Sequence, residues 1–175
     1  MTVEPDTSFA VLRVPVPPAE ALGLLGDRTY AVLVDEAGHV LALGTAADLA
    51  GGRSLPPGVE IPAGISLDDV VGGEAMTLLD LNPHGAVVVR DRDVLGVISA
   101  AMIDEAASSG QVASRTMGEG TDSGLPGDIR VPTARVTCAW PSCGHVNALT
   151  FYDPDRPDDC ANPDLPAHAI TLSGG

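Results

Sequence analysis

The stretch Tyr30–Leu49, YAVLVDEAGHVLALGTAADL, contains the pattern that decides the fold. Its first five residues are almost all apolar, as expected of a strand that is covered on both faces. Asp35-Glu36-Ala37-Gly38 has the composition of a tight turn, in which a glycine can adopt a positive φ. Residues 40–43 are apolar again, and Thr45 follows as a helix start. The stretch therefore predicts a β-hairpin that leads directly into a helix.

The same pattern occurs a second time at Gly85–Ile103, GAVVVRDRDVLGVISAAMI. Each copy is preceded by a short apolar segment that ends at a proline, Phe9–Val14 before the first and Val59–Ile61 before the second. A unit that recurs along a chain usually reflects a repeated architecture. We therefore predict an α+β fold in which the order strand, helix, hairpin, helix occurs twice.

The helices between each first strand and its hairpin differ in length. Ala19–Leu25 has a fair apolar face for a short helix in the first copy. In the second copy, Ser66 can cap a helix that has Asp69 three residues further on. Gly72-Gly73 lies inside that pattern and weakens it, because glycine is a poor helix former. The apolar face of this helix would consist of Leu67, Val70, Val71, Leu78 and Leu79.

Composition divides the rest of the chain. The repeated region spans residues 9–107, with copy one over about 9–52 and copy two over about 57–107. Residues 108–135 are rich in Gly, Ser, Thr, Asp and Pro, and such a segment cannot bury enough apolar surface to offset its ordering entropy. It is therefore predicted to be a flexible linker. Residues 136–175 form a short tail that contains all three cysteines.

The formal net charge of -15 excludes several classes of partner. Binding to nucleic acid requires clustered cations that displace counterions from phosphates, and docking on an anionic membrane requires similar clusters. No apolar run approaches the ~20 residues of a membrane-spanning helix. The start, MTVEPDTS, lacks the basic and apolar regions of a signal peptide. We expect a soluble cytoplasmic protein that binds neither nucleic acid nor membrane.

The repeated unit resembles a tandem pair of cystathionine-β-synthase (CBS) domains, often called a Bateman module. The resemblance is carried by VLVDEAGHVLALGTAADL and VVVRDRDVLGVISAAMI, in which an apolar hairpin leads to Thr or Ser at a helix start, and it covers roughly residues 9–107. It implies that the two copies pack with pseudo-two-fold symmetry and that the pair forms a homodimer. It also implies that AMP, ATP or an adenosyl compound binds in the cleft between the copies.

The resemblance also suggests which residues would bind that ligand. By motif, Thr45 would face the phosphate and Asp48 would hold the ribose hydroxyls, while Ser99 is the equivalent of Thr45 in copy two. Met102 stands where the family has Asp, so at most one competent site is expected, in copy one. A helix N-terminus does offer free N–H groups to a phosphate. Thr45-x-x-Asp48 is equally a helix N-cap with an acidic third residue, which requires no ligand.

The tail contains Cys138, Cys143, Cys160 and His168 in the spacing C-x4-C-x16-C-x7-H. Three thiolates and one imidazole are a common ligand set for structural zinc. A module of this size has too little core to fold alone, and a metal would supply the missing stability. The sequence therefore predicts a zinc-ribbon-like tail. His145 competes with His168 as fourth ligand; free thiols, a Cys138–Cys143 disulfide and a catalytic zinc with bound water are the other options.

These observations predict a non-enzymatic regulatory protein. Its CBS pair would sense an adenine nucleotide or serve as a dimerisation platform, and its zinc-stabilised tail would dock on a protein partner. One alternative is a scaffold or interaction protein whose CBS pair binds no ligand. The other is a metal-dependent hydrolytic enzyme that uses the tail site.

Overall fold

The computed structural model describes residues 4–52, 54–73, 76–108 and 131–172 of the 175-residue chain. Most of the predicted linker, residues 109–130, lies outside these ranges. Two units follow one another with nearly the same order of elements, and we call them repeat one and repeat two. Repeat one comprises β1 (Phe9–Arg13), α1 (Pro18–Leu25), β2 (Tyr30–Val34), β3 (Val40–Thr45) and α2 (Ala46–Ala50). Repeat two comprises β4 (Val59–Pro62), α3 (Leu67–Val71), α4 (Met76–Leu79), β5 (Gly85–Arg90), β6 (Asp93–Ser99) and α5 (Ala100–Ser108).

The two repeats share their strand pairing in detail. In each, the first strand runs parallel to the second, and the second pairs antiparallel with the third. Both hairpins have a register shift at the same place, between Leu33 and Val34 in repeat one and between Val88 and Val89 in repeat two. The predicted fold class, α+β with two like repeats in strand-helix-hairpin-helix order, is therefore confirmed.

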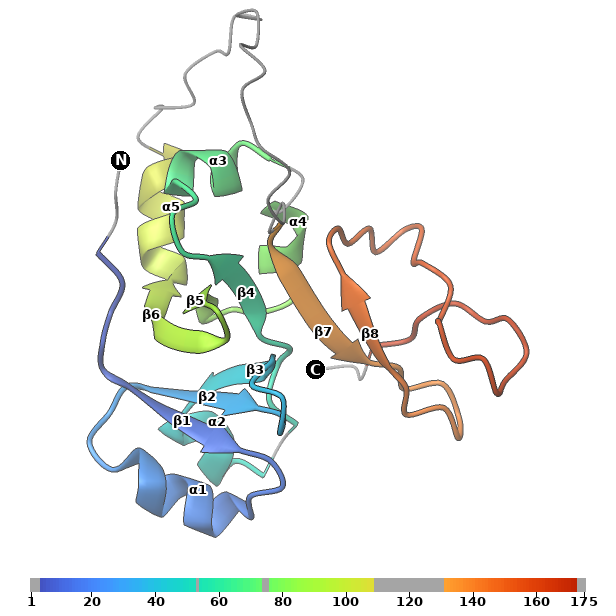
Figure 1. The fold of residues 1–175 in the computed structure, drawn as a ribbon, viewed down its shortest axis with the longest axis horizontal. Coiled ribbons are helices and arrows are strands. Elements are labelled where there is room, and N and C mark those ends of the chain that lie inside the picture. The colour runs from blue at the N-terminus through green and yellow to red at the C-terminus, as the bar shows by residue number, and fades with distance from the viewer. Residues whose placement is uncertain (1–3, 53, 74–75, 109–130, 173–175) are drawn as a thin grey trace, which may run out of the picture.

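The two sheets face each other through aliphatic side chains from the hairpins of both repeats. The members of this cluster are fully or almost fully buried, and they are Val32, Val34, Val40, Leu43, Val87 and Val97. The opposite face of the first sheet packs on α1 and α2, and that of the second packs on helices of repeat two. Figure 1 shows the resulting arrangement, with repeat one in blue and cyan and repeat two in green and yellow.

The segment before each repeat pairs with the third strand of the other repeat. Asp6 exchanges two backbone hydrogen bonds with Val97 of β6, of 2.8 and 2.9 Å. Pro57, just before β4, forms a bridge with Ala42 of β3. Each sheet is thus extended by backbone from the other half of the pair. This exchange ties the repeats together beyond their apolar contact.

The second repeat departs from the sequence prediction at its glycine pair. Ser66 caps a helix as predicted, with its Oγ accepting from the Asp69 N–H at 3.1 Å. That helix, α3, ends at Val71 with Gly72 as its C-cap, and α4 follows as a separate helix. Within the described residues, no helix is long and apolar enough to cross a bilayer.

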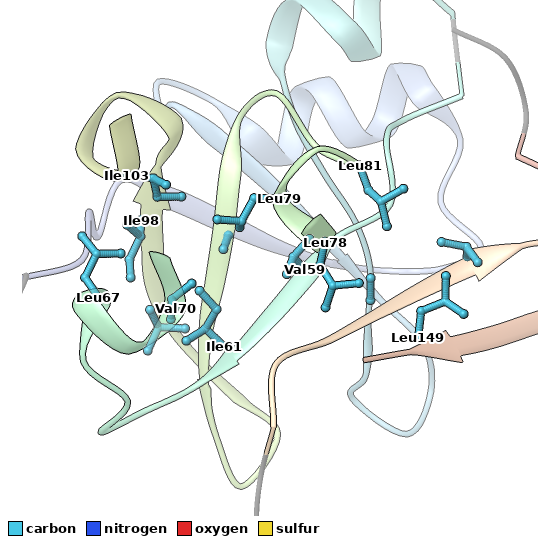
Figure 2. Packing of buried hydrophobic residues seen from close by; sticks show 14 of the residues in the cluster. Val59, Ile61, Leu67, Val70, Leu78, Leu79, Leu81, Ile98, Ile103 and Leu149 are labelled. Carbon is cyan, nitrogen blue, oxygen red and sulfur yellow. The ribbon is translucent and has the colours of Figure 1, made fainter. Parts of the chain in front are cut away.

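The tail, residues 131–172, extends the sheet of repeat two. Its strands are β7 (Thr133–Thr137) and β8 (Val146–Leu149). β7 pairs antiparallel with β4, so the five strands have the order β6-β5-β4-β7-β8. Figure 2 shows Leu149 of the tail in the same buried cluster as Val59 and Leu78 of repeat two. β7 begins within residues that the composition assigned to the linker, and the tail shares a core with repeat two.

The interface between the repeats provides a test of the fold. Leu43 is fully buried there, whereas Leu24 on α1 is 52% exposed. We expect Leu43→Ala to lower the free energy of unfolding by about 2 to 5 kcal/mol, because it removes buried methyl groups and leaves a cavity. The matched control Leu24→Ala is expected to change it by less than about 0.5 kcal/mol. Urea denaturation followed by circular dichroism measures both, and equal effects would contradict the packing described here.

Candidate functional site

Four side chains of the tail converge on one point. The ligand atoms of Cys138, Cys143, Cys160 and His168 all lie within 4.8 Å of one another. Cys138 Sγ lies 3.6 Å from His168 Nε2, and Cys143 Sγ lies 3.6 Å from Cys160 Sγ. A tetrahedral zinc ion with bonds of about 2.3 Å to sulfur and 2.0 Å to nitrogen separates its ligand atoms by roughly 3.5 to 3.8 Å. The two separations are therefore those that such an ion requires.

A tight turn after β7 positions the first two cysteines. The Cys143 N–H donates to the Trp140 carbonyl at 2.9 Å, and the Gly144 N–H donates to the Cys138 carbonyl at 3.2 Å. Ser142 and Gly144 have φ values of 66° and 62°, which let the chain fold back over a few residues. This turn brings Cys143 towards Cys138, which is buried at the end of β7.

Backbone pairing positions the other two ligands. The Cys160 N–H donates to the His168 carbonyl at 2.8 Å, beside an antiparallel bridge between Asp159 and Ala169. His168 Nδ1 lies 2.7 Å from the Pro166 carbonyl, which can only accept a hydrogen bond. Nδ1 therefore carries a proton, and Nε2 is the atom directed at the sulfurs. The Trp140 ring covers the imidazole, with the ring centroids 5.1 Å apart.

Amide donors surround the sulfurs. Asn147 Nδ2 lies 3.5 Å from Cys160 Sγ, and Asn162 Nδ2 lies 3.4 Å from Cys143 Sγ. Burial opposes ionisation of Cys143, but the hydrogen bonds from Asn162 and from the His145 backbone lower the pKa of its thiol to about 6. Asn147 is itself buried, and its Oδ1 accepts from the Ala161 N–H at 2.8 Å. Such outer hydrogen bonds orient metal ligands and tune their affinity.

The electrostatics of the cluster favour a cation. Burial raises the pKa of Cys160, and the neighbouring sulfurs of Cys143 and Cys138 raise it further. The Pro166 carbonyl raises the pKa of His168 to about 9, with a further contribution from the sulfurs. Three sulfurs crowded this closely can all ionise only if a positive charge lies among them. A divalent metal would supply that charge and displace the protons.

The competing assignments in the tail can be compared with this geometry. The convergent group includes His168 and does not include His145, whose carbonyl accepts from the Cys138 N–H at 2.8 Å. The three cysteines form no disulfide. The four residues brought together are those predicted from their spacing.

The start of α2 has a different character. Asp48 Oδ2 accepts from the Thr45 N–H at 2.7 Å and from Thr45 Oγ1 at 2.6 Å, which closes a capping box. The same oxygen lies 2.9 Å from His84 Nε2 of repeat two. Burial opposes ionisation, but the bonds from Thr45 and the charge of His84 lower the pKa of Asp48. At the equivalent position of repeat two, Ser99 Oγ accepts from the Met102 N–H at 3.3 Å.

Asn82 positions His84 and was missed by sequence reasoning. This buried side chain donates to the Leu43 carbonyl at 3.0 Å and to the Pro57 carbonyl at 2.8 Å. Its Oδ1 accepts from the His84 N–H at 2.9 Å. Asn82 thus fastens a loop of repeat two onto β3 of repeat one. Its only sequence signal is Asn before Pro, which indicates a turn and nothing about a contact between repeats.

A pocket of about 280 Å³ lies between α4 and α5 of repeat two. Its lining includes Asp80 and Asp104, and neither Thr45 nor Asp48 is among the lining residues. Among the residues that the structure describes, no Arg lines it either, so these residues offer a phosphate two carboxylates and no cation. The pocket is therefore poorly suited to an anionic nucleotide.

Comparisons with known proteins do not identify a family for this chain. No family model and no curated protein matches the sequence. Among solved structures, Staphylococcus aureus OpuCA matches with a TM-score of 0.41 and 17% identity, over 61% of this chain and 93% of that chain. A likeness this distant carries no argument about a site. What the structure itself shows is the internal repeat of β1–α2 by β4–α5.

The amide donors provide a test of whether the cluster binds a metal ion. We expect Asn147→Ala to weaken metal binding by about 10- to 100-fold, because Cys160 loses a hydrogen bond that orients its sulfur. Competition with a chromophoric chelator measures the affinity. Thr150→Ala, one residue beyond β8 and exposed, is the control and should bind as the unmodified chain does. Equal affinities for the two variants would exclude this role for Asn147.

Proposed function

We propose that the protein is a non-enzymatic regulatory scaffold, a CBS-like pair whose tail is held by one structural zinc ion. The observation that carries this proposal is the convergence of Cys138, Cys143, Cys160 and His168 within 4.8 Å. The donor set suits zinc, which binds thiolate and imidazole in tetrahedral sites. Zinc would add the stability that a tail with few buried side chains lacks.

The ligand set supports a structural role over a hydrolytic one. Catalytic zinc sites keep one position open for water, and four protein ligands close the tetrahedron. The site is also covered, because Trp140 lies over His168 and because Cys138, Cys160 and His168 are buried. A substrate would have to displace one of these ligands to reach the ion.

The surroundings of Asp48 support a scaffold over a nucleotide sensor. The oxygen that would hold a ribose already has three partners, two from Thr45 and one from His84. α2 has only 5 residues, so its N-terminus offers a phosphate little dipole. The capping box explains Thr45 and Asp48 without a ligand. Nucleotide sensing therefore remains the second candidate.

A protein partner would find apolar contacts on the tail. Trp140, Val146 and Phe151 are 47%, 45% and 39% exposed. Large side chains of this kind, and Trp above all, are enriched in the centres of protein interfaces. Docking through the tail and homodimerisation of the pair are both part of this proposal.

Metal analysis tests the zinc site directly. We expect purified protein to contain about one zinc ion per chain, and His168→Ala to lose most of it because three ligands bind more weakly than four. His145→Ala is the matched control and should keep its zinc, since this residue lies outside the convergent group. Mass spectrometry of the metal content gives the result. Zinc loss in His145→Ala with retention in His168→Ala would reverse the ligand assignment.

Calorimetry separates the scaffold from the sensor. We expect no saturable heat from AMP, ATP or an adenosyl compound, because Asp48 is already engaged by Thr45 and His84. A saturable isotherm that disappears in Asp48→Ala would overturn the scaffold proposal in favour of sensing. Loss of the isotherm in Asp48→Ala would count only if circular dichroism shows that the variant is folded.

A further inference from the structure

Glu60 of β4 lies where the tail and both repeats meet. Its Oε1 accepts from the Val40 N–H of β3 at 2.6 Å and from Arg135 Nη1 of β7 at 2.7 Å. The side chains of Arg135 and Glu60 are 18% and 16% exposed. One carboxylate oxygen therefore joins repeat one, repeat two and the tail.

The repeat itself does not require this carboxylate. Glu60 lies opposite Val87 in the parallel pair of repeat two, and Val11 lies opposite Val32 in that of repeat one. Val11 is thus the equivalent of Glu60, and it is 46% exposed. The acidic residue occurs in the repeat whose first strand pairs with the tail. Its role is therefore connected with the tail.

The metal centre is joined to this junction by a short piece of backbone. Cys138 directly follows the last residue of β7, Thr137. β7 pairs with β8 through four residue pairs but with β4 through two, Val59 with Ala134 and Glu60 with Thr133. Two pairs form a weak ladder on their own. Besides the apolar core that the tail shares with repeat two, the position of β7 on β4 therefore depends on the anchored Cys138 and on the Arg135–Glu60 pair.

We propose that metal occupancy of the tail site controls how firmly repeat one is held against repeat two, through Arg135, Glu60 and the Val40 N–H. The inference rests on the proposed zinc site and assigns it a regulatory consequence. Glu60 and Arg135 are positioning residues in this arrangement. Without the metal, β7 loosens and Arg135 moves away from Glu60. The carboxylate is then left partly buried without its cation, and it turns to water at the expense of Val40.

Hydrogen exchange at single amides tests this coupling in the full chain. The Val40 amide reports the junction, and the Val97 amide, which donates to the Asp6 carbonyl at 2.9 Å, reports the same pair of repeats away from the tail. We expect removal of zinc by a chelator to speed exchange at Val40 by roughly fivefold or more relative to Val97, as expected for the loss of one hydrogen bond. Equal changes at the two amides in a folded, metal-free chain would overturn the coupling.

A variant that keeps the metal excludes simple unfolding of the chain as the cause. Arg135→Gln leaves all four ligands in place and should retain one zinc ion, yet exchange at Val40 should match that of the metal-free protein. Arg156→Gln, in an exposed loop of the tail, is the matched control and should leave Val40 protected. Full protection of Val40 in zinc-loaded Arg135→Gln would overturn this inference alone. Absence of zinc from the unmodified protein would remove the proposed function with it.

Discussion

The contact between two aliphatic sheet faces is the constraint on which the rest of the molecule depends. Val32 and Leu43 of repeat one meet Val87 and Val97 of repeat two, and all four are fully buried. A sheet of three short strands has one face covered by helices and needs a partner for the other. The second repeat supplies that partner. The hydrogen bonds of Asn82 to the Leu43 and Pro57 carbonyls and the Asp48–His84 pair then depend on this packing, which neither repeat could achieve alone.

The features of the fold that the sequence predicted correctly are those that depend on residues close together in the chain. The hairpins were predictable because apolar runs flank a turn, and the glycine of the first, Gly38, has a φ of 83° in the structure. The helix cap at Ser66 was predictable from another local signal, because Asp69 follows three residues later. The contacts that sequence reasoning missed join distant residues, as with Arg135 and Glu60, which are 75 positions apart. Thr133–Thr137 has strand-forming residues but follows a segment of low complexity, so its pairing with β4 had no local signal.

The convergence of the cysteines and one histidine was only partly predictable from the sequence. Cysteines have few other roles in a chain with no disulfides, so the spacing of three of them with a nearby histidine was informative. The choice between His145 and His168 was not fixed by spacing, because both could reach the site. It depends on the backbone pairing of Cys160 with His168. Asn147 could not have been identified from sequence, because nothing local indicates that an asparagine within β8 donates a hydrogen bond to sulfur.

The charge of Glu60 is one reason why the tail joins one edge of the pair and not the other. The fold presents two equivalent first strands, β1 and β4, and a strand such as β7 could pair with either. On β4, Arg135 finds a carboxylate at 2.7 Å. On β1 the equivalent residue is Val11, and a guanidinium placed against it would lose hydration without gaining an acceptor. The apolar side chain therefore disfavours the wrong edge while the acidic one favours the right edge. Specificity of this kind requires both a favourable contact at the right edge and an unfavourable one at the wrong edge. The two repeats offer two equivalent edges, and the difference between Val11 and Glu60 helps to make them unequal.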